Sequence, residues 1–451
     1  MDEMHTQETP QETPRAIVTL TARQEKALLR PTGSRRHAVF SVRSSVESAP
    51  SRTTAAAQAA EAPARRPLTL ALTLDRSGSM SGEPLRMAKQ VAVSLVDGLN
   101  EHDEIAVVVF DDKIDTLQER AAVTPEVKER IRRELARIEA RGSTALHEAW
   151  LSSCRLITGD QLQETRLARC YLLTDGQANV GETDVETIAS QAGDVRDHTG
   201  IGTSAFGLGE NYNERLLGPW AIAGGGQFHH LRHLGDLADT FLGERDDLRA
   251  VVALRTRLEV EMSEGALAET ISAYRRSHAD RFANRWSLDI GDLVNGEERN
   301  VVVRFSFPKE NKAYSYTVKA RVVWVDGRGE QAGPWQEMTF TQASDAACSD
   351  EPRDPQAMRW IGLAHADRTK QRALELEAGH AREQAVWRLR QAIARIGEYA
   401  GDDPELREAM RDLEALADAM SARKLTPMES KEAYFAQQTR SRGQKDYRKG
   451  Q

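Results

Sequence analysis

The residues best suited to chemistry in this 451-residue chain are oxygen-bearing side chains that follow a short apolar run. Asp75, Ser77 and Ser79 alternate directly after residues 68–74, a run rich in Leu and Thr. This spacing lets one carboxylate and two hydroxyls point to the same side of a loop. Hard cations such as Mg²⁺ prefer such all-oxygen donor sets and keep some of their waters. The stretch therefore predicts a divalent-cation site.

Two further segments carry residues of the same kind. Ser143 and Thr144 lie between two predicted helices, and Asp175 directly follows the apolar run 168–174. In open α/β sheets, ligands bind at the carboxyl ends of the strands. If the strands before Asp75 and Asp175 are neighbours, these two acids face one crevice, which the hydroxyl of Thr144 reaches from its own loop.

The elements that must position these residues alternate between strand and helix. Short apolar runs at 68–74, 105–110 and 168–174 are separated by segments with an apolar residue every three or four positions. Strands joined by helices of this length imply βαβ crossovers. We therefore predict a doubly wound, mostly parallel sheet over residues 67–247.

Residues 248–342 have a different pattern. In the runs 257–262, 301–307 and 314–322 apolar and polar residues alternate, which is typical of antiparallel strands with one buried face. The short β-like pieces 16–20 and 38–42 are too few for a stable sheet of their own. We predict that they complete a β-sandwich into which the α/β domain is inserted.

The remaining segments follow from composition. The predicted organisation is a disordered tail (1–15), the N-terminal sandwich strands (16–45), a linker (46–66), the α/β domain (67–247), the rest of the sandwich (248–342), a linker (343–355), a helical bundle (356–422) and a disordered basic tail (423–451).

Charge and cysteine content narrow the function classes. The net charge of -8 disfavours a general electrostatic attraction to nucleic acid. The 3 cysteines cannot all pair, and we expect buried free thiols in a reducing compartment. The N-terminal residues lack the apolar core of a signal peptide, and no apolar run approaches the roughly 18 residues of a membrane span. A cytoplasmic protein is the expectation.

Three motifs occur in this order: Asp-x-Ser-x-Ser at 75–79, Gly-Ser-Thr at 142–144 and Thr-Asp-Gly at 174–176. Together they resemble the metal-ion-dependent adhesion site of von Willebrand factor type A domains, as found in bacterial-type members of that family. By position, Asp75, Ser77 and Ser79 correspond to the ligands of the first loop, Thr144 to that of the second, and Asp175 to the acid of the third, which often acts through water. All the positions match, so the resemblance implies an intact site. It covers residues 68–245.

The resemblance also implies a function. The cation would be Mg²⁺, or Mn²⁺ or Ca²⁺, and an Asp or Glu of a protein partner would complete its coordination. The chain would be a binding module and not an enzyme. Soluble bacterial proteins of this family often work with MoxR-like AAA+ ATPases, so such a partner is an expectation by analogy.

The same residues also fit other interpretations. Asp75 and Asp175 could merely cap helices while the serines satisfy a turn. His229, His230 and His233 could bind a soft metal, although an edge strand and the following turn explain them better. Asp111 and Asp112 end the strand at 105–110, either as a surface turn or near enough to tune the charge of the metal.

Other functions are less well supported. An RNA-particle protein of the Ro type also pairs such a domain with helices, but residues 357–420 lack a continuous basic stripe with interleaved aromatics. A metal-dependent hydrolase would need a general base, and none is evident. Met80 stands where a nucleophile elbow needs its serine, and Leu151 replaces the second histidine of the zinc-protease pattern.

Overall fold

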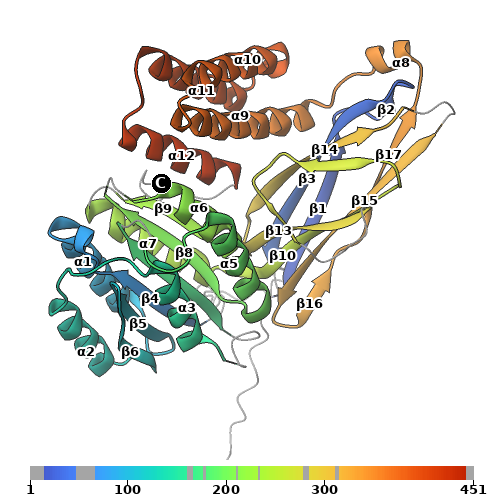
Figure 1. Cartoon of the computed structure of the whole chain (residues 1–451). Helices are drawn as coiled ribbons and strands as arrows, with labels where there is room; N and C mark the ends of the chain where they lie inside the picture. Colours follow the sequence, from blue (N-terminus) through green and yellow to red (C-terminus); the bar gives the residue numbers. More distant parts are fainter. Residues whose placement is uncertain are drawn as a thin grey trace, which may run out of the picture.

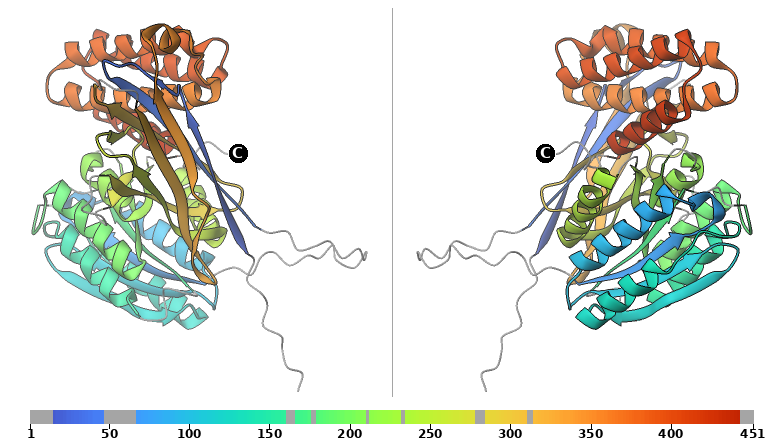
Figure 2. Two further views of the ribbon diagram at one scale, coloured as in Figure 1. Left: turned by 90° about the vertical axis from the view of Figure 1, so that its right-hand side faces the viewer. Right: turned by 90° about the vertical axis from the view of Figure 1, so that its left-hand side faces the viewer.

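The structure is a computed structural model that describes residues 15–46, 67–159, 166–175, 179–209, 212–231, 234–277, 284–309 and 314–442. It contains an α/β domain, a β-sandwich and a helical region (Figure 1). The side views of Figure 2 place the C-terminal helical region at one end of the molecule and the α/β domain at the other, and Figure 1 shows the sandwich strands beside both. The predicted fold class is confirmed.

The α/β domain is built on a 6-stranded sheet in the order β6-β5-β4-β7-β8-β9. Its strands are β4 (Leu68–Asp75), β5 (Glu104–Phe110), β6 (Ile114–Ala122), β7 (Leu167–Thr174), β8 (Gly202–Leu208) and β9 (Gly225–Leu231). Only the pair of β5 with β6 is antiparallel. Every residue of β4 and β7 is buried, as expected of central strands with helices on both faces.

Helices cover the two faces of this sheet in two groups. One face carries α1 (Glu83–Gly98), α2 (Pro125–Ala136) and α7 (Leu234–Arg249). The other carries α3 (Leu146–Ile157), α5 (Val185–Thr199) and α6 (Glu214–Ala223). Alternate residues of β4 point into the hydrophobic cores on opposite faces of the sheet. Leu70 and Leu72 pack on the α1 side, and Ala71 packs on the α3 side.

The β-sandwich combines strands from before and after the α/β domain. One sheet is 4-stranded in the order β1-β3-β14-β11, and the other is 7-stranded along β12-β13-β10-β15-β17-β2, with β16 paired to β15. The strands are β1 (Ala16–Gln24), β2 (Leu28–Leu29), β3 (Ser34–Val46), β10 (Val251–Met262), β11 (Leu267–Thr270), β12 (Arg275–Ser277), β13 (Arg285–Val294), β14 (Glu298–Phe307), β15 (Ser315–Asp326), β16 (Gly329–Ala332) and β17 (Gln336–Gln342). The α/β domain is thus inserted between β3 and β10, as predicted.

The helical region packs against the sandwich and the α/β domain. It contains α9 (Pro355–Ala378), α10 (Arg382–Ala400), α11 (Pro404–Ala422) and α12 (Pro427–Ser441). The segment predicted as the linker 343–355 also holds a short helix, α8 (Asp345–Asp350). Its Cys348 is buried, and Glu351 accepts hydrogen bonds from the backbone of Ala27 and Leu28. These contacts hold the segment against the sandwich.

The prediction of a disordered basic tail at 423–451 is wrong for the part that forms α12. A capping box formed by Thr426 and Glu429 begins this helix, and Phe435 is buried in the core beside α6. Lys431 donates to the backbone oxygen of Tyr212 at 2.5 Å and to Glu214 at 2.6 Å. The basic residues of α12, Lys431 and Arg440, form ion pairs within the chain. The helix covers the edge strand β9.

Two expectations about the whole chain can be compared with the structure. Cys154 and Cys170 are free and buried, as expected, and Cys348 is free and buried as well. Over the described residues, no helix has the length and apolar character that a membrane crossing requires.

A pair of histidines joins α9 to the sandwich. His365 Nε2 lies 3.2 Å from His37 Nε2, and His37 Nδ1 lies 3.3 Å from a carboxylate oxygen of Glu25. Burial, the neighbouring His37 and the positive charges of Arg304, Arg368 and Arg395 lower the pKa of His365 from 6.5 to about 4.

This pair makes the stability of the protein sensitive to mild acid. Between pH 6.5 and about 4 the unfolded chain protonates His365 and the folded chain does not, so the free energy of unfolding falls as the pH falls. We expect His365→Gln to reduce this fall, measured as urea midpoints between pH 7 and pH 5. Curves of equal slope for the two proteins would contradict the assignment.

Candidate functional site

The predicted first-loop residues lie at the carboxyl end of the central strand. Asp75 is the last residue of β4 and is fully buried. Its Oδ1 accepts a hydrogen bond from the backbone N–H of Ser77 at 2.7 Å. Its Oδ2 accepts one from the hydroxyl of Thr174 at 2.5 Å. Thr174 ends the neighbouring strand β7, so the register of the two strands brings the loops together.

A chain of hydroxyl contacts leads from the first loop to the third. Ser77 Oγ lies 3.1 Å from Ser79 Oγ, and Ser79 Oγ donates to Asp175 Oδ1 at 2.9 Å. Ser77 and Asp175 are buried, whereas Ser79, in the 3₁₀ turn η2 (Gly78–Met80), is exposed. Asp75, Ser77, Ser79 and Asp175 therefore form one cluster that opens to the surface at Ser79.

The second loop is held against the first by its backbone. The N–H of Gly78 donates to the carbonyl of Gly142 at 3.1 Å, and that of Arg141 donates to the carbonyl of Arg76 at 2.8 Å. Gly142 has φ +70°, and a Cβ there would lie 2.1 Å from a carboxylate oxygen of Asp112. A side chain at this position would be strained by the positive φ and would have to displace Asp112, so glycine favours this approach between the loops.

Thr144 follows in the same loop and is buried. Its N–H donates to the side-chain oxygen of Asn179 at 2.8 Å, and its carbonyl accepts from the N–H groups of Asn179 and Val180. Among the described residues, no hydrogen bond joins its hydroxyl to the other predicted ligands. Thr144 thus lies on the adjoining loop, but its side chain is not part of the hydrogen-bonded cluster.

The two carboxylates of the cluster lack a positive partner within the described part of the chain. Burial raises the pKa of Asp75 to about 6, and the negative charge of Asp175 adds to this effect. Burial also raises the pKa of Asp175. No Lys or Arg of the described residues forms an ion pair with either acid. Carboxylate and hydroxyl oxygens without an internal cation are the donor set that suits a hard divalent ion.

Asp111 provides the opposite case at the end of the adjacent strand β5. It is fully buried and accepts from Arg76 Nε at 2.9 Å and from Arg141 Nε at 2.6 Å. Burial acts to raise its pKa, but the Arg141 bond, the N–H of Lys113 and the charges of both arginines hold the pKa below its usual value. Asp111 is therefore buried and ties the first loop to the second, whereas Asp112 is exposed in the turn after β5. An effect of these acids on the charge of a bound metal stays a prediction.

Sequence reasoning missed Thr174, Asn179 and the Arg76–Asp111 pair. A polar residue at the end of a buried strand, as at Thr174, was the available signal. The alternative that Asp75 caps a helix is wrong, although its carboxylate does accept a hydrogen bond from the N–H of Ser77 in the turn. The side chain of Asp75 caps neither η2 nor α1, whose N-cap residues are Ser77 and Gly82.

The histidines do not form a metal cluster in the part of the structure that is described. His229 Nε2 lies 2.6 Å from Glu244 Oε2, and His230 Nδ1 lies 2.5 Å from the hydroxyl of Tyr212. His233 lies outside the described residues. Within those residues, no group of three or more His, Cys, Asp or Glu side chains is placed to hold a metal. The predicted cluster differs in kind, since it combines two carboxylates with hydroxyls.

Comparisons with known proteins agree with this fold. Residues 70–177 match the family model of the von Willebrand factor type A domain. An uncharacterised protein of Synechocystis sp. is 30% identical over 251 residues, which are 54% of this chain and 58% of that protein. The match therefore spans little more than half the length of that relative.

Two solved structures share the architecture of nearly the whole chain. A von Willebrand factor type A protein from Catenulispora acidiphila has a TM-score of 0.71 at 16% identity, covering 95% of this chain and 98% of that one. The ArnB paralog VWA2 from Sulfolobus acidocaldarius has a TM-score of 0.59 at 18% identity, covering 94% and 99%. At these identities the likeness shows the fold, namely a von Willebrand factor type A domain with its flanking domains.

The uncompensated charge of Asp75 makes a prediction about stability. In EDTA at pH 8, Asp75→Asn removes a buried charge and leaves an oxygen to accept from Ser77, so we expect an unchanged or higher free energy of unfolding, by up to about 1–2 kcal/mol. The matched control is Asp111→Asn, which removes the buried charge that pairs with Arg76 and Arg141 and leaves Arg76 only its ion pair with Asp115, so it should cost about 3 kcal/mol. Urea unfolding measures both, and equal losses in the two variants would contradict the charge assignment.

Proposed function

We propose that this chain is a metal-dependent protein-binding module without catalytic activity. Asp75, Ser77 and Ser79 would hold a divalent cation, Mg²⁺ or alternatively Mn²⁺ or Ca²⁺. Asp175 and Thr144 would complete the protein side, directly or through water. The cation would balance the charges of the two acids.

The observation that carries this proposal is the contrast between neighbouring acids. Asp111 is matched by two arginines, whereas Asp75 and Asp175 lie together with hydroxyl donors and no described cation. Burying carboxylates in this way is costly unless an opposite charge is supplied. A bound cation supplies that charge. The family model that matches residues 70–177 describes a domain of protein-interaction and adhesion proteins, which supports the same conclusion.

The partner is expected to present a carboxylate. Mg²⁺ takes about six oxygen ligands, and the five protein residues proposed here leave at least one position open, so an Asp or Glu of a partner would find a ligand position on the cation. Ser79 is exposed, which makes that position accessible from the surface. Binding rather than catalysis is proposed because the described cluster consists of hydroxyls and two carboxylates that the cation would occupy, and it contains no further side chain to act as a general base.

The proposal of an AAA+ ATPase partner rests on the family resemblance alone, and the RNA-particle alternative gains no support from the structure. A MoxR-like AAA+ ATPase is one protein that could present such a carboxylate, by analogy with related proteins. For the RNA-particle alternative, Lys431 and Arg440, which were expected in a free basic tail, instead pair with Glu214 and Asp367. These cations are therefore engaged within the chain.

Metal binding is tested by isothermal titration of the full chain with Mg²⁺ and with Mn²⁺. We expect one site in the wild type and none in Asp75→Ala, because a central ligand is lost. Thr144→Val should weaken binding by about tenfold if this hydroxyl contributes a ligand or orders a water ligand. Asp111→Ala is not a suitable control because it disturbs the contact between the loops. The control is Asp115→Ala, because the carboxylate of Asp115 is half exposed and pairs with the outer nitrogens of Arg76 and Arg141. Equal titrations of wild type and Asp75→Ala would overturn the proposal.

The carboxylate requirement is tested with displayed peptides. Peptides selected against the wild type in Mg²⁺ should share an Asp or Glu. Changing that residue to Asn or Gln, or adding chelator, should weaken binding by at least about tenfold. We call the surface around Asp75, Ser79 and Asp175 the metal face. Peptides that bind equally well to Asp75→Ala or in EDTA would show that the metal face is not the binding surface.

A further inference from the structure

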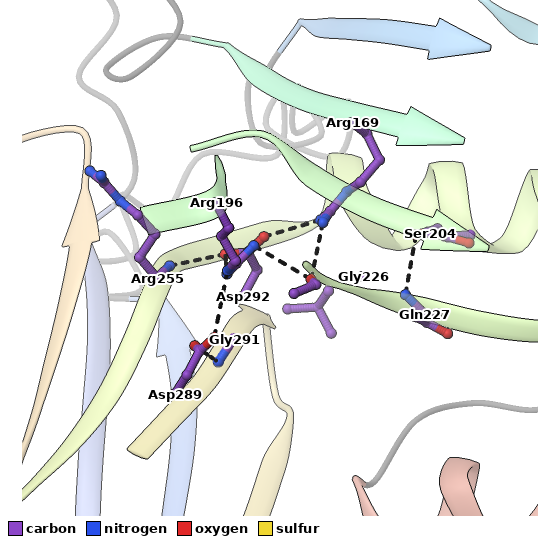
Figure 3. A network of polar contacts seen from close by, with 12 residues as sticks. Arg169, Arg196, Ser204, Gly226, Gln227, Arg255, Asp289, Gly291 and Asp292 are labelled. Carbon is purple, nitrogen blue, oxygen red and sulfur yellow. Dashed lines mark hydrogen bonds and ion pairs between the residues drawn. The ribbon is translucent and has the colours of Figure 1, made fainter. Parts of the chain in front are cut away.

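A second candidate site lies where the α/β domain, the sandwich and α12 meet. A cavity of about 200 Å³ is enclosed by the start of β7 and β9, the end of α7, the turn between β13 and β14, and Arg442 at the end of α12. It lies near the amino ends of the parallel strands, opposite the edge that carries Asp75. Figure 3 shows part of its wall, with Arg169 and Arg196 directed toward Asp292.

The carboxylates in this wall are already satisfied by donors. Asp292 accepts from Arg169 Nη2 at 3.1 Å, from Arg196 Nη2 at 2.9 Å and from the N–H of Arg255 at 2.9 Å. Burial acts to raise the pKa of Asp292, but the two arginine charges hold it well below its usual value. Glu297 accepts from Arg299 Nε at 2.7 Å. These acids and arginines form a closed network.

Glu244 and Asp247 also line the cavity. The carboxylate of Glu244 is bound by the hydroxyl of Ser204 and by His229. Asp247, on α7, also has a bonding partner within the protein. The acids of the wall are therefore engaged by groups of the protein itself.

Arg442 differs from the other arginines of the wall. Its side chain is nearly fully buried, with 4% exposed, and its Nη1 donates to the carbonyl of Gly226 at 3.2 Å. Its Nε has no hydrogen-bond partner, nor has Nε of Arg169, which lines the same cavity. Among the described residues no carboxylate forms an ion pair with Arg442. Burial and the positive charge of Arg299 lower the pKa of Arg442 to about 10.

A buried guanidinium without an anionic partner is costly. An anion in the cavity that Arg442 lines would remove this cost. Arginine binds oxyanions through several donors at once, and phosphate is a preferred ligand of this geometry. A cavity of about 200 Å³ is large enough for such an ion with a few waters, since a water takes about 30 Å³ in the liquid.

We propose that this cavity binds a phosphate group, either inorganic phosphate or the phosphate of a small monoester, beside the guanidinium of Arg442 and with the positive charge of Arg169 on the same wall. The two arginines belong to different parts of the chain, α12 and β7, so the bound anion would join the helical region to the α/β domain. Because Asp247 also lines the cavity, one small anion fits better than a polyphosphate. The proposal does not depend on the metal face.

The test uses the full chain in EDTA, so that the metal face plays no part. Thermal unfolding is compared in sodium phosphate and in sodium chloride of equal ionic strength. We expect saturating phosphate to raise the Tm of the wild type by about 2–5 °C. Titration followed by ³¹P NMR at 20 °C should show Arg442→Gln binding phosphate at least about tenfold more weakly, with circular dichroism confirming that the variant is folded at that temperature.

Arg440→Gln is the matched control. Arg440 lies on the same helix and pairs with Asp367 and Asp412, and it does not line the cavity. This variant is expected to lose stability but to keep the wild-type affinity for phosphate. Arg442→Lys, which keeps the charge and loses the planar donors, should bind with intermediate affinity.

A parallel titration with glycerol phosphate separates the two sources of the ligand. Tighter binding than inorganic phosphate assigns the site to a monoester, and equal or weaker binding assigns it to the free ion. The proposal is overturned if the wild type shows no phosphate dependence, as when a carboxylate of this chain occupies the cavity. It is also overturned if Arg442→Gln and Arg440→Gln bind phosphate equally well.

Discussion

The parallel pairing of β4 with β7 is the constraint on which the candidate site depends. Their register sets Leu74 beside Leu173, so the next residues bring Asp75, Thr174 and Asp175 to one edge of the sheet. Both strands are buried throughout, and a slip of one residue would turn their apolar side chains away from the cores on either face. The packing that stabilises the domain therefore also fixes the distance between two acids that would otherwise repel each other.

The loops beyond these strands divide the charges between two roles. Arg76 and Arg141 converge on Asp111 and tie the first loop to the second, which gives rigidity without a ligand. Asp75 and Asp175 have no such partner among the described residues, so their charge is available to a cation. The sandwich and α12 hold the domain on other sides, with Phe435 packed into its core. The edge of the sheet that carries Asp75 thus belongs to a domain that is braced from its other end.

Much of this organisation could be predicted from local patterns. The apolar run before Asp75, the alternation around Val301 and Val303 and the order of the three loops each reflect a short segment that carries its own signal. The helix at 427–441 could not be found in this way, because Phe435 and Lys431 are stabilised by residues some two hundred positions earlier. For the same reason Asp111 reads as a surface turn until the two arginines are seen to converge on it.

The central claim is that oxygens from separate loops surround one ion, and it is tested most directly by a crystal structure of the full chain soaked in Mn²⁺. The account predicts one anomalous peak bonded to the oxygens of Asp75, Ser77 and Ser79, with Asp175 and Thr144 bound to it or to its waters. The peak should be absent from crystals of Asp75→Ala. Saturating Mn²⁺ with no peak at this edge, and an unbroken hydrogen bond from Ser79 to Asp175, would contradict it.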